Sequence, residues 1–230
     1  PAATPIRYRF IASSWLDPAQ KPGLIPDAHR LTSALSSESQ EAKPPHPMIL
    51  SLFRKDPNKD AADALYAAAL EQARTPAFYL NYGVADTVEG RFELASLHVY
   101  LLLRRLKGAG EETKKLAQML LDTFFSDMDG VLRELGVGDL SVARKIRGLA
   151  EAFFGRVTAY EAAMAEEADQ GALTDALARN VYGDVDPSAA AALADYARRS
   201  AATLAEQPIG RIKSGIANFA APVEQATENG

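Results

Sequence analysis

One short run of residues has the composition of a catalytic motif. DMDGVL (Asp127 to Leu132) places two carboxylates two residues apart, next to a glycine and after an aromatic pair. Such a pair can hold a magnesium ion and act on a phosphoryl group. This chemistry requires the first aspartate to end a buried parallel strand, ahead of a loop that cradles the phosphate. The residues around the motif therefore decide whether it is catalytic.

The hydrophobic pattern predicts a helix through this motif. At about 100° per residue, one broad face collects the apolar residues Leu120, Leu121, Phe124, Met128, Val131, Leu132 and Leu135. Asp129 and Arg133 stand four apart on the opposite face, in the favourable order for an exposed helical ion pair. The sequence also lacks the alternation of strands and helices of a doubly wound sheet. A haloacid-dehalogenase-type phosphatase is thus a disfavoured alternative.

The sequence shows no residue spacing typical of another catalytic or metal site. As a calcium loop, DMDG would have Val131 at the third ligand position, and His98 lacks the Glu-x-x-His spacing of di-iron bundles. No nucleophile with a base and no phosphate-cradling loop can be recognised. An isoprenoid-type synthase would need a second Asp-rich motif. We therefore predict a protein that is not an enzyme, with no catalytic residue, cofactor or metal.

The centre of the chain is predicted to be a helical hairpin. A second apolar stripe steps by three and four along the residues Val142, Ile146, Leu149, Phe153, Val157, Tyr160 and Met164. Gly136 is the expected C′ residue of the first helix, and Asp139 or Ser141 the expected N-cap of the second. Since the link is short, the helices are antiparallel neighbours. No segment reads as a strand, so we predict an all-α, single-domain bundle of about six to seven helices.

The helix expected over residues 87–107, capped by Asp86 or Thr87, carries two apolar stripes. One stripe includes Val99, and the other consists of Leu94, Leu97 and Leu101. A helix that is apolar on two faces either lies at the centre of a fold or presents one face to a partner. This helix is therefore the first place to look for a binding surface.

Five further residues are candidates for contact with a partner. His98 lies between the two stripes, and we favour an ordinary His that is half-buried and hydrogen-bonded to a neighbour. Asp127 edges the apolar face of its helix and suits a specific pairing. Lys145 and Arg156 flank the stripe of the second hairpin helix, either as stems that cover the core edge or as the basic rim of a partner site. Phe154 points sideways, with burial against another helix as the default.

Composition limits the classes of function. The chain has 230 residues, a net charge of −5 and no cysteine. The net charge argues against a dedicated nucleic-acid binder, and the missing cysteines exclude disulfides and thiolate catalysis. No apolar run approaches the roughly 18 residues that cross a bilayer. We expect at most peripheral contact with a membrane.

Proline and glycine divide the chain into three parts. Residues 1–47 hold eight prolines and no sustained period, so we predict an irregular extension. Residues 48–207 carry the helical patterns and form the predicted domain. The Gly-broken segment 208–230 is expected to be a loose tail. Asp186 is the expected N-cap of the last long helix, which begins at Pro187.

Three linked motifs resemble one protein family. GRFELASLHVYLLLRRL (90–106), FFSDMDGVLRELGVGDLSVARKI (124–146) and AFFGRVTAYEAA (152–163) are similar, in order and spacing, to the ubiquinol–cytochrome c chaperones, the assembly factors of the cytochrome bc complex. The resemblance extends from about Leu65 to Leu204. It maps the family's DMD, LRE, GVGD and FGR positions onto Asp127–Asp129, Leu132–Glu134, Gly136–Asp139 and Phe154–Arg156.

The resemblance implies a helical protein that binds newly made cytochrome b and shields it during assembly. Family analogy adds a small partner assembly factor or the ribosome as further partners. It places a bacterial member in the cytoplasm, at the inner face of the inner membrane, and a eukaryotic one in the mitochondrial matrix. A helical adaptor for another membrane complex is the remaining alternative from the residues themselves.

A client made of transmembrane helices calls for an apolar groove with a polar rim. We expect the stripe of Leu94, Leu97 and Leu101 to contribute to this groove. Its other expected contributors are Phe154, Lys145 and Arg156.

Overall fold

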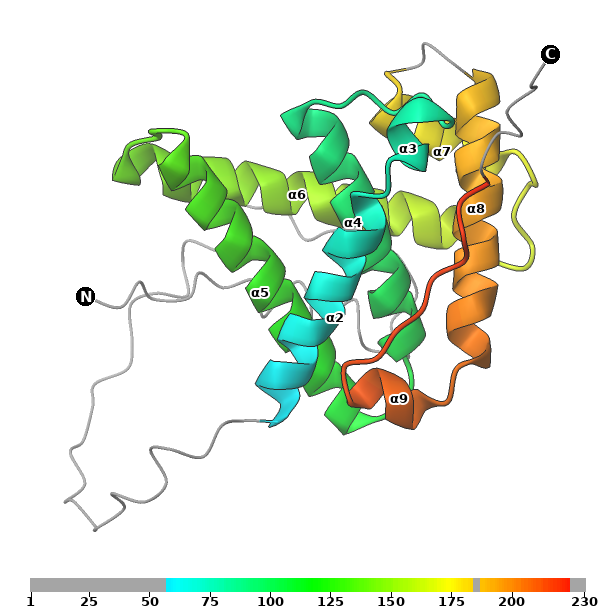
Figure 1. The fold of residues 1–230 in the computed structure, drawn as a ribbon, viewed down its shortest axis with the longest axis horizontal. Helices are drawn as coiled ribbons and strands as arrows, with labels where there is room; N and C mark the ends of the chain where they lie inside the picture. Colours follow the sequence, from blue (N-terminus) through cyan, green and yellow to red (C-terminus); the bar gives the residue numbers. More distant parts are fainter. Residues whose placement is uncertain (1–56, 184–186, 224–230) are drawn as a thin grey trace.

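The structure is a computed structural model that describes residues 57–183 and 187–223. Within these residues every regular element is a helix (Figure 1), which confirms the all-α prediction. The elements are α2 (Pro57–Ala73), α3 (Ala77–Leu80), α4 (Val88–Leu106), α5 (Glu111–Glu134), α6 (Asp139–Ala163), α7 (Ala172–Val181), α8 (Pro187–Glu206) and α9 (Ile209–Lys213). The predicted extension 1–47 and the predicted cap Asp186 lie outside the described residues.

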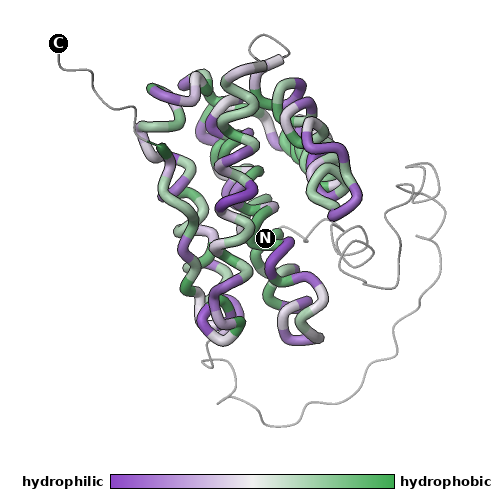
Figure 2. The backbone as a smooth tube through the Cα atoms, turned by 90° about the vertical axis from the view of Figure 1, so that its right-hand side faces the viewer, coloured by the Kyte–Doolittle hydropathy of each residue, from purple (hydrophilic) through white to green (hydrophobic). Residues whose placement is uncertain are grey.

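Helix α4 forms the centre of the bundle. It packs against α2, α5, α6, α7 and α8, and its residues from Glu93 to Leu103 are all buried. Thr87 caps its N-terminus, where the side chain accepts a hydrogen bond from the Gly90 amide. Central position thus explains why the sequence of α4 is apolar on two faces. Figure 2 shows hydrophobic and hydrophilic residues interleaved along the helices of the bundle.

The predicted hairpin is formed by α5 and α6. Gly136 has φ +78°, and its amide donates to the Arg133 carbonyl at 2.9 Å. The Val137 amide reaches back to the Leu132 carbonyl at 3.0 Å, which completes a Schellman motif and confirms Gly136 as the C′ residue. The predicted N-cap of α6 is wrong, because Gly138 occupies that position and Asp139 is already helical.

The C-terminal segment differs from the prediction of a loose tail. Residues 208–223 form α9 and then a non-helical stretch, drawn in red in Figure 1, that lies along α8. Phe219 packs against the core. Hydrogen bonds from helix side chains, rather than any hydrophobic period, hold this stretch, which is why the sequence pattern gives no sign of it.

Candidate functional site

The two aspartates of the DMD motif lie within helix α5 and not at the end of a strand. Asp129 pairs with Arg133 at 2.5 Å on the exposed face, as the spacing predicts. Asp127 accepts a hydrogen bond of 2.7 Å from the Tyr66 hydroxyl of α2. Burial, reinforced by this bond, raises the pKa of Tyr66 above its ordinary value. The motif therefore ties α5 to its neighbour α2, and its backbone has no phosphate-binding loop.

The expected client-facing stripe on α4 is part of the core. Leu94 and Leu97 are 0% exposed and Leu101 is 1% exposed. The structure therefore shows no surface groove made by these leucines. In this folded state a client would reach them only after a neighbouring helix had moved.

His98 is more deeply buried than the sequence suggests. Its Nδ1 lies 2.7 Å from the Leu94 carbonyl and its Nε2 lies 2.8 Å from the Tyr196 hydroxyl. Because a carbonyl only accepts, Nδ1 carries the proton, and Nε2 of the neutral ring accepts from Tyr196. Burial lowers the pKa of His98 to about 4, against a smaller opposing effect of the Leu94 carbonyl. His98 is thus a satisfied, neutral core residue.

Two candidates on α6 take part in packing. Phe154 is buried and contacts Phe125 and Phe153, as its default interpretation predicts. Arg156 donates from Nε to Glu93 of α4 at 2.5 Å and pairs with the second carboxylate oxygen through Nη2. This bidentate pair connects α6 to α4 at the edge of the core, so Arg156 does not form a free basic rim.

The distal end of the hairpin has a different character. We call residues 126–147 the arm; Figure 1 shows its connecting loop away from the other helices. No residue from Ser126 to Asp139 is buried, although this stretch includes the apolar side chains Met128, Val131, Leu132, Leu135 and Val137. Leu135 is 62% exposed. Lys145 is exposed on the adjoining helix and makes no ion pair with the described residues. The arm therefore joins accessible apolar surface to an exposed basic group.

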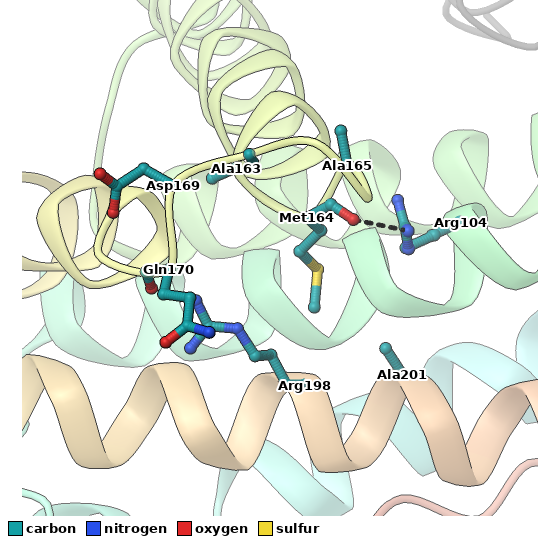
Figure 3. A pocket seen from close by; sticks show the side chains of 9 residues that line it. Arg104, Ala163, Met164, Ala165, Asp169, Gln170, Arg198 and Ala201 are labelled. Atoms are coloured by element: carbon teal, nitrogen blue, oxygen red, sulfur yellow. Dashed lines mark hydrogen bonds between the residues drawn. The ribbon is translucent and has the colours of Figure 1, made fainter.

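A second polar region lies at the other end of α6. Glu161 accepts hydrogen bonds from Arg104 at 2.5 Å, Lys107 at 3.1 Å and Tyr100 at 3.1 Å. Burial alone would raise the pKa of Glu161, but the two cations outweigh it and hold the pKa below its ordinary value. Beside this cluster is an open hollow of about 330 Å³ between α4, α8 and the α6–α7 loop. Figure 3 shows that Arg104 reaches the Met164 carbonyl on its wall.

Sequence reasoning missed the partners of its own candidates. Tyr66 and Glu93 lie 61 and 63 positions from Asp127 and Arg156, respectively. One signal was available for Glu93, which is an acidic residue at the start of the longest buried run of the chain's central helix. Buried acids are paired, so that position called for a basic partner.

The described residues contain neither a metal-binding cluster nor a helix that could span a membrane. No group of three or more histidine, aspartate or glutamate side chains in residues 57–183 and 187–223 is arranged to hold a metal ion. None of the helices described there has the combined length and hydropathy that a membrane span requires.

Comparison with known proteins shows which structures and sequences this chain is similar to. The crystal structure of the Cbp3 homolog from Brucella abortus superposes with a TM-score of 0.67 at 37% sequence identity, covering 76% of this chain and 97% of that one. The ubiquinol-cytochrome-c reductase complex assembly factor 1 of Xenopus laevis is 24% identical over 143 residues, which are 61% of this chain and 70% of the frog protein.

Mammalian relatives give the same result over a smaller share of their length. The chain matches the assembly factor 1 proteins of Mus musculus and Homo sapiens at 24% identity and spans about half of each, 48% and 47%. Residues 80–219, from α3 to the segment after α9, match the family described as ubiquinol-cytochrome C chaperone. These matches confirm the resemblance carried by the three sequence motifs. The chain belongs to the ubiquinol-cytochrome C chaperone family.

Proposed function

We propose that this protein is an assembly factor of the cytochrome bc complex that binds newly synthesised cytochrome b. The family match over residues 80–219 supports a role in the assembly of ubiquinol–cytochrome c reductase. The relatives named as assembly factors of that complex support the same role. Cytochrome b is the component we propose as client, because an apolar transmembrane segment needs cover before its partners arrive.

One structural observation supports a client site on the arm. Val131 and Leu132 are only half-buried, and Leu135 is 62% exposed. Contiguous apolar surface on a folded protein commonly marks a contact site. An amphipathic or transmembrane helix docks on such a surface through residues spaced by three and four. Val131, Leu132 and Leu135 have this spacing, and Lys145 and Asp127 supply charged groups at its rim.

The remaining candidate residues are buried or already paired in the folded bundle. Leu94, Leu97, His98, Leu101 and Phe154 are buried, so they contact a client only if the bundle opens. Arg156 is engaged with Glu93 and would act through the position of α6. A photo-crosslinking residue at Leu97 tests whether the bundle opens, because this buried position can form an adduct with a client only after the helices around it have moved apart.

Site-specific crosslinking tests the arm with a matched control. A photo-crosslinking amino acid replaces Leu135 on the arm or Leu80 on α3, two leucines that are 62% and 78% exposed. We expect an adduct with newly made cytochrome b from Leu135 and none from Leu80. An adduct from Leu80 alone would show that the arm is the wrong surface.

The client itself is tested by removing the protein. Deletion of the gene is expected to abolish the haem absorbance of the bc complex and leave other cytochromes in place. Intact spectra, together with no cytochrome b adduct from any position, would rule out the proposed function and favour an adaptor for another complex.

A further inference from the structure

The backbone of the segment after α9 is held by side chains of α8, of α2 and of the residues that follow α3, which we together call the groove. We call residues 216–223 the strap; it runs without helical turns between α8 on one side and α2 and α3 on the other (Figure 1). Gly215, with φ +86°, stands immediately before it against Ala61 and Ala64 of α2. The strap is thus an extended ligand-like segment joined to the bundle through one sharply turned residue.

Residue 218 is held at both of its backbone groups. The Gln207 side chain donates from Nε2 to the Asn218 carbonyl at 2.8 Å. Its Oε1 accepts from the Asn218 amide at 2.9 Å. One primary amide therefore satisfies a donor and an acceptor of the same residue, as a neighbouring strand would in a sheet.

The same arrangement recurs two residues further along. The Ala220 amide donates to Ser200 Oγ of α8 at 3.2 Å, and the Ala220 carbonyl accepts from Gln72 Nε2 of α2 at 3.2 Å. On one side of the groove α8 thus accepts from the amide of Ala220, and on the other side α2 donates to its carbonyl.

The end of the strap is held in the same way. The Val223 amide donates to the Tyr82 hydroxyl at 2.8 Å, and the Val223 carbonyl accepts from Asn81 at 3.3 Å. Arg199 donates to the Ala221 carbonyl at 3.0 Å. Backbone groups are common to every peptide, so these contacts bind an extended chain with little regard to its side chains.

One side chain of the strap adds a specific contact. The ring of Phe219 packs edge-on against His98, with centroids 5.0 Å apart. Ala217 and Ala220 also pack against the core, whereas Asn218 and Ala221 are exposed. The groove therefore selects an aromatic residue at one position and small residues beside it.

We propose that this groove is a peptide-binding site that the strap occupies in cis. Its ligand in trans is an extended segment of a partner protein, with an aromatic residue in the place of Phe219 and small neighbours. The strap can be exchanged because it carries no charged side chain that could form an ion pair with the groove, and because Phe219 is only half-buried. Binding in trans releases the strap, so the two segments compete.

Competition with the strap determines the design of the test. A tethered segment has a high effective concentration, so the cis contact has to be weakened first. Two full-length variants do this independently. Phe219→Ala removes the aromatic anchor, and Ala220→Pro removes the amide that donates to Ser200. The probe is a fluorescently labelled peptide with the sequence of residues 216–223, followed by fluorescence anisotropy.

We expect the peptide to bind both variants at least tenfold more tightly than the wild-type chain. The Phe→Ala version of the peptide should bind at least tenfold more weakly. Adding Gln207→Ala to the Phe219→Ala chain should also weaken binding, because the paired contact to residue 218 is lost.

Three results would overturn the proposal. The first is no binding to either variant, with circular dichroism showing both folded. The second is equal binding to variants and wild type. The third is failure of both variants to fold, because the strap would then be part of the folding core. None of these readouts involves cytochrome b, so the result is independent of the proposed client.

Discussion

Arg156 of α6 holds Glu93 of α4 through both carboxylate oxygens. The Glu93 side chain is 9% exposed and that of Arg156 is 19% exposed. Burial raises the pKa of Glu93 despite the opposing effect of Arg156. The guanidinium also lies 5.8 Å from the ring centre of Phe92 and donates to the Ala152 carbonyl. This pair positions the helix that carries one half of the arm.

Loss of one partner of this pair is expected to be costly. Arg156→Ala leaves Glu93 buried without its cation, and breaking a buried pair in this way costs about 3 to 5 kcal/mol. The measurement is the free energy of unfolding from urea titration. Arg133→Ala is the matched control, because the pairs of Arg133 with Asp129 and Asp139 are both exposed and should contribute far less.

The double variant Glu93→Leu/Arg156→Leu distinguishes the penalty of an unpaired charge from the contribution of the pair. We expect it to recover most of the stability lost in Arg156→Ala, because no buried charge remains. A double variant as unstable as the single one would show that the specific geometry of the pair, rather than charge burial, holds α6 in place.

His98 is predicted to make stability depend on pH. Its pKa is about 4 in the folded protein and about 6.5 in an unfolded chain. Between these values the unfolded state binds more protons, so stability is greatest above about pH 6.5 and falls as the pH drops toward 4. A shift of this size corresponds to about 3 kcal/mol over that window.

Urea unfolding at several pH values, with and without His98→Gln, isolates this contribution. Glu93 and Glu161 also titrate at acidic pH, with opposite directions of shift, so the difference between the two proteins is the quantity to compare. The difference should shrink as the pH falls from 7 to 4. A difference that stays constant would show that His98 is not the titrating group.

The parts of the fold that the sequence predicted are those that depend on residues close together in the chain. Thr87 and Gly136 are recognisable because capping depends on residues within one turn. The hairpin follows from two apolar stripes and a short link. The all-α class and the position of the DMD motif within a helix were therefore accessible without a structure.

The candidate site was less predictable because burial is a property of the whole bundle. The second stripe of α4, which includes Leu97, has the same pattern whether a neighbouring helix or a client covers it. Only the packing around α4 shows that the core covers it. The strap was missed for another reason. Its backbone is held by distant side chains such as Gln72, 148 positions from Ala220, and such contacts leave no periodicity in the sequence.

The two aspartates of the DMD motif are expected to differ in their effect on stability. Asp127→Ala removes the acceptor of the part-buried Tyr66 hydroxyl and should cost about 1 to 2 kcal/mol. Asp129→Ala removes one partner of an exposed pair between residues four apart and should cost about 0.5 kcal/mol or less. Unfolding free energies of the two variants give the comparison. Equal losses would mean that the Tyr66 contact contributes nothing.

Two glycines with positive φ provide a test of how the strap begins. Gly136→Ala at φ +78° meets open space, so it should cost only the backbone strain of about 1 to 2 kcal/mol. Gly215→Ala at φ +86° adds a Cβ that would lie 2.8 Å from the Ala64 side chain and 3.2 Å from the Ala61 backbone. Overpacking of this kind adds about 1 to 3 kcal/mol. Thermal and urea unfolding should therefore rank Gly215→Ala as the more destabilised variant. If Gly136→Ala were instead the more destabilised variant, the turn into the strap would have adjusted without disturbing α2. The close approach to Ala61 and Ala64 would then not constrain the strap.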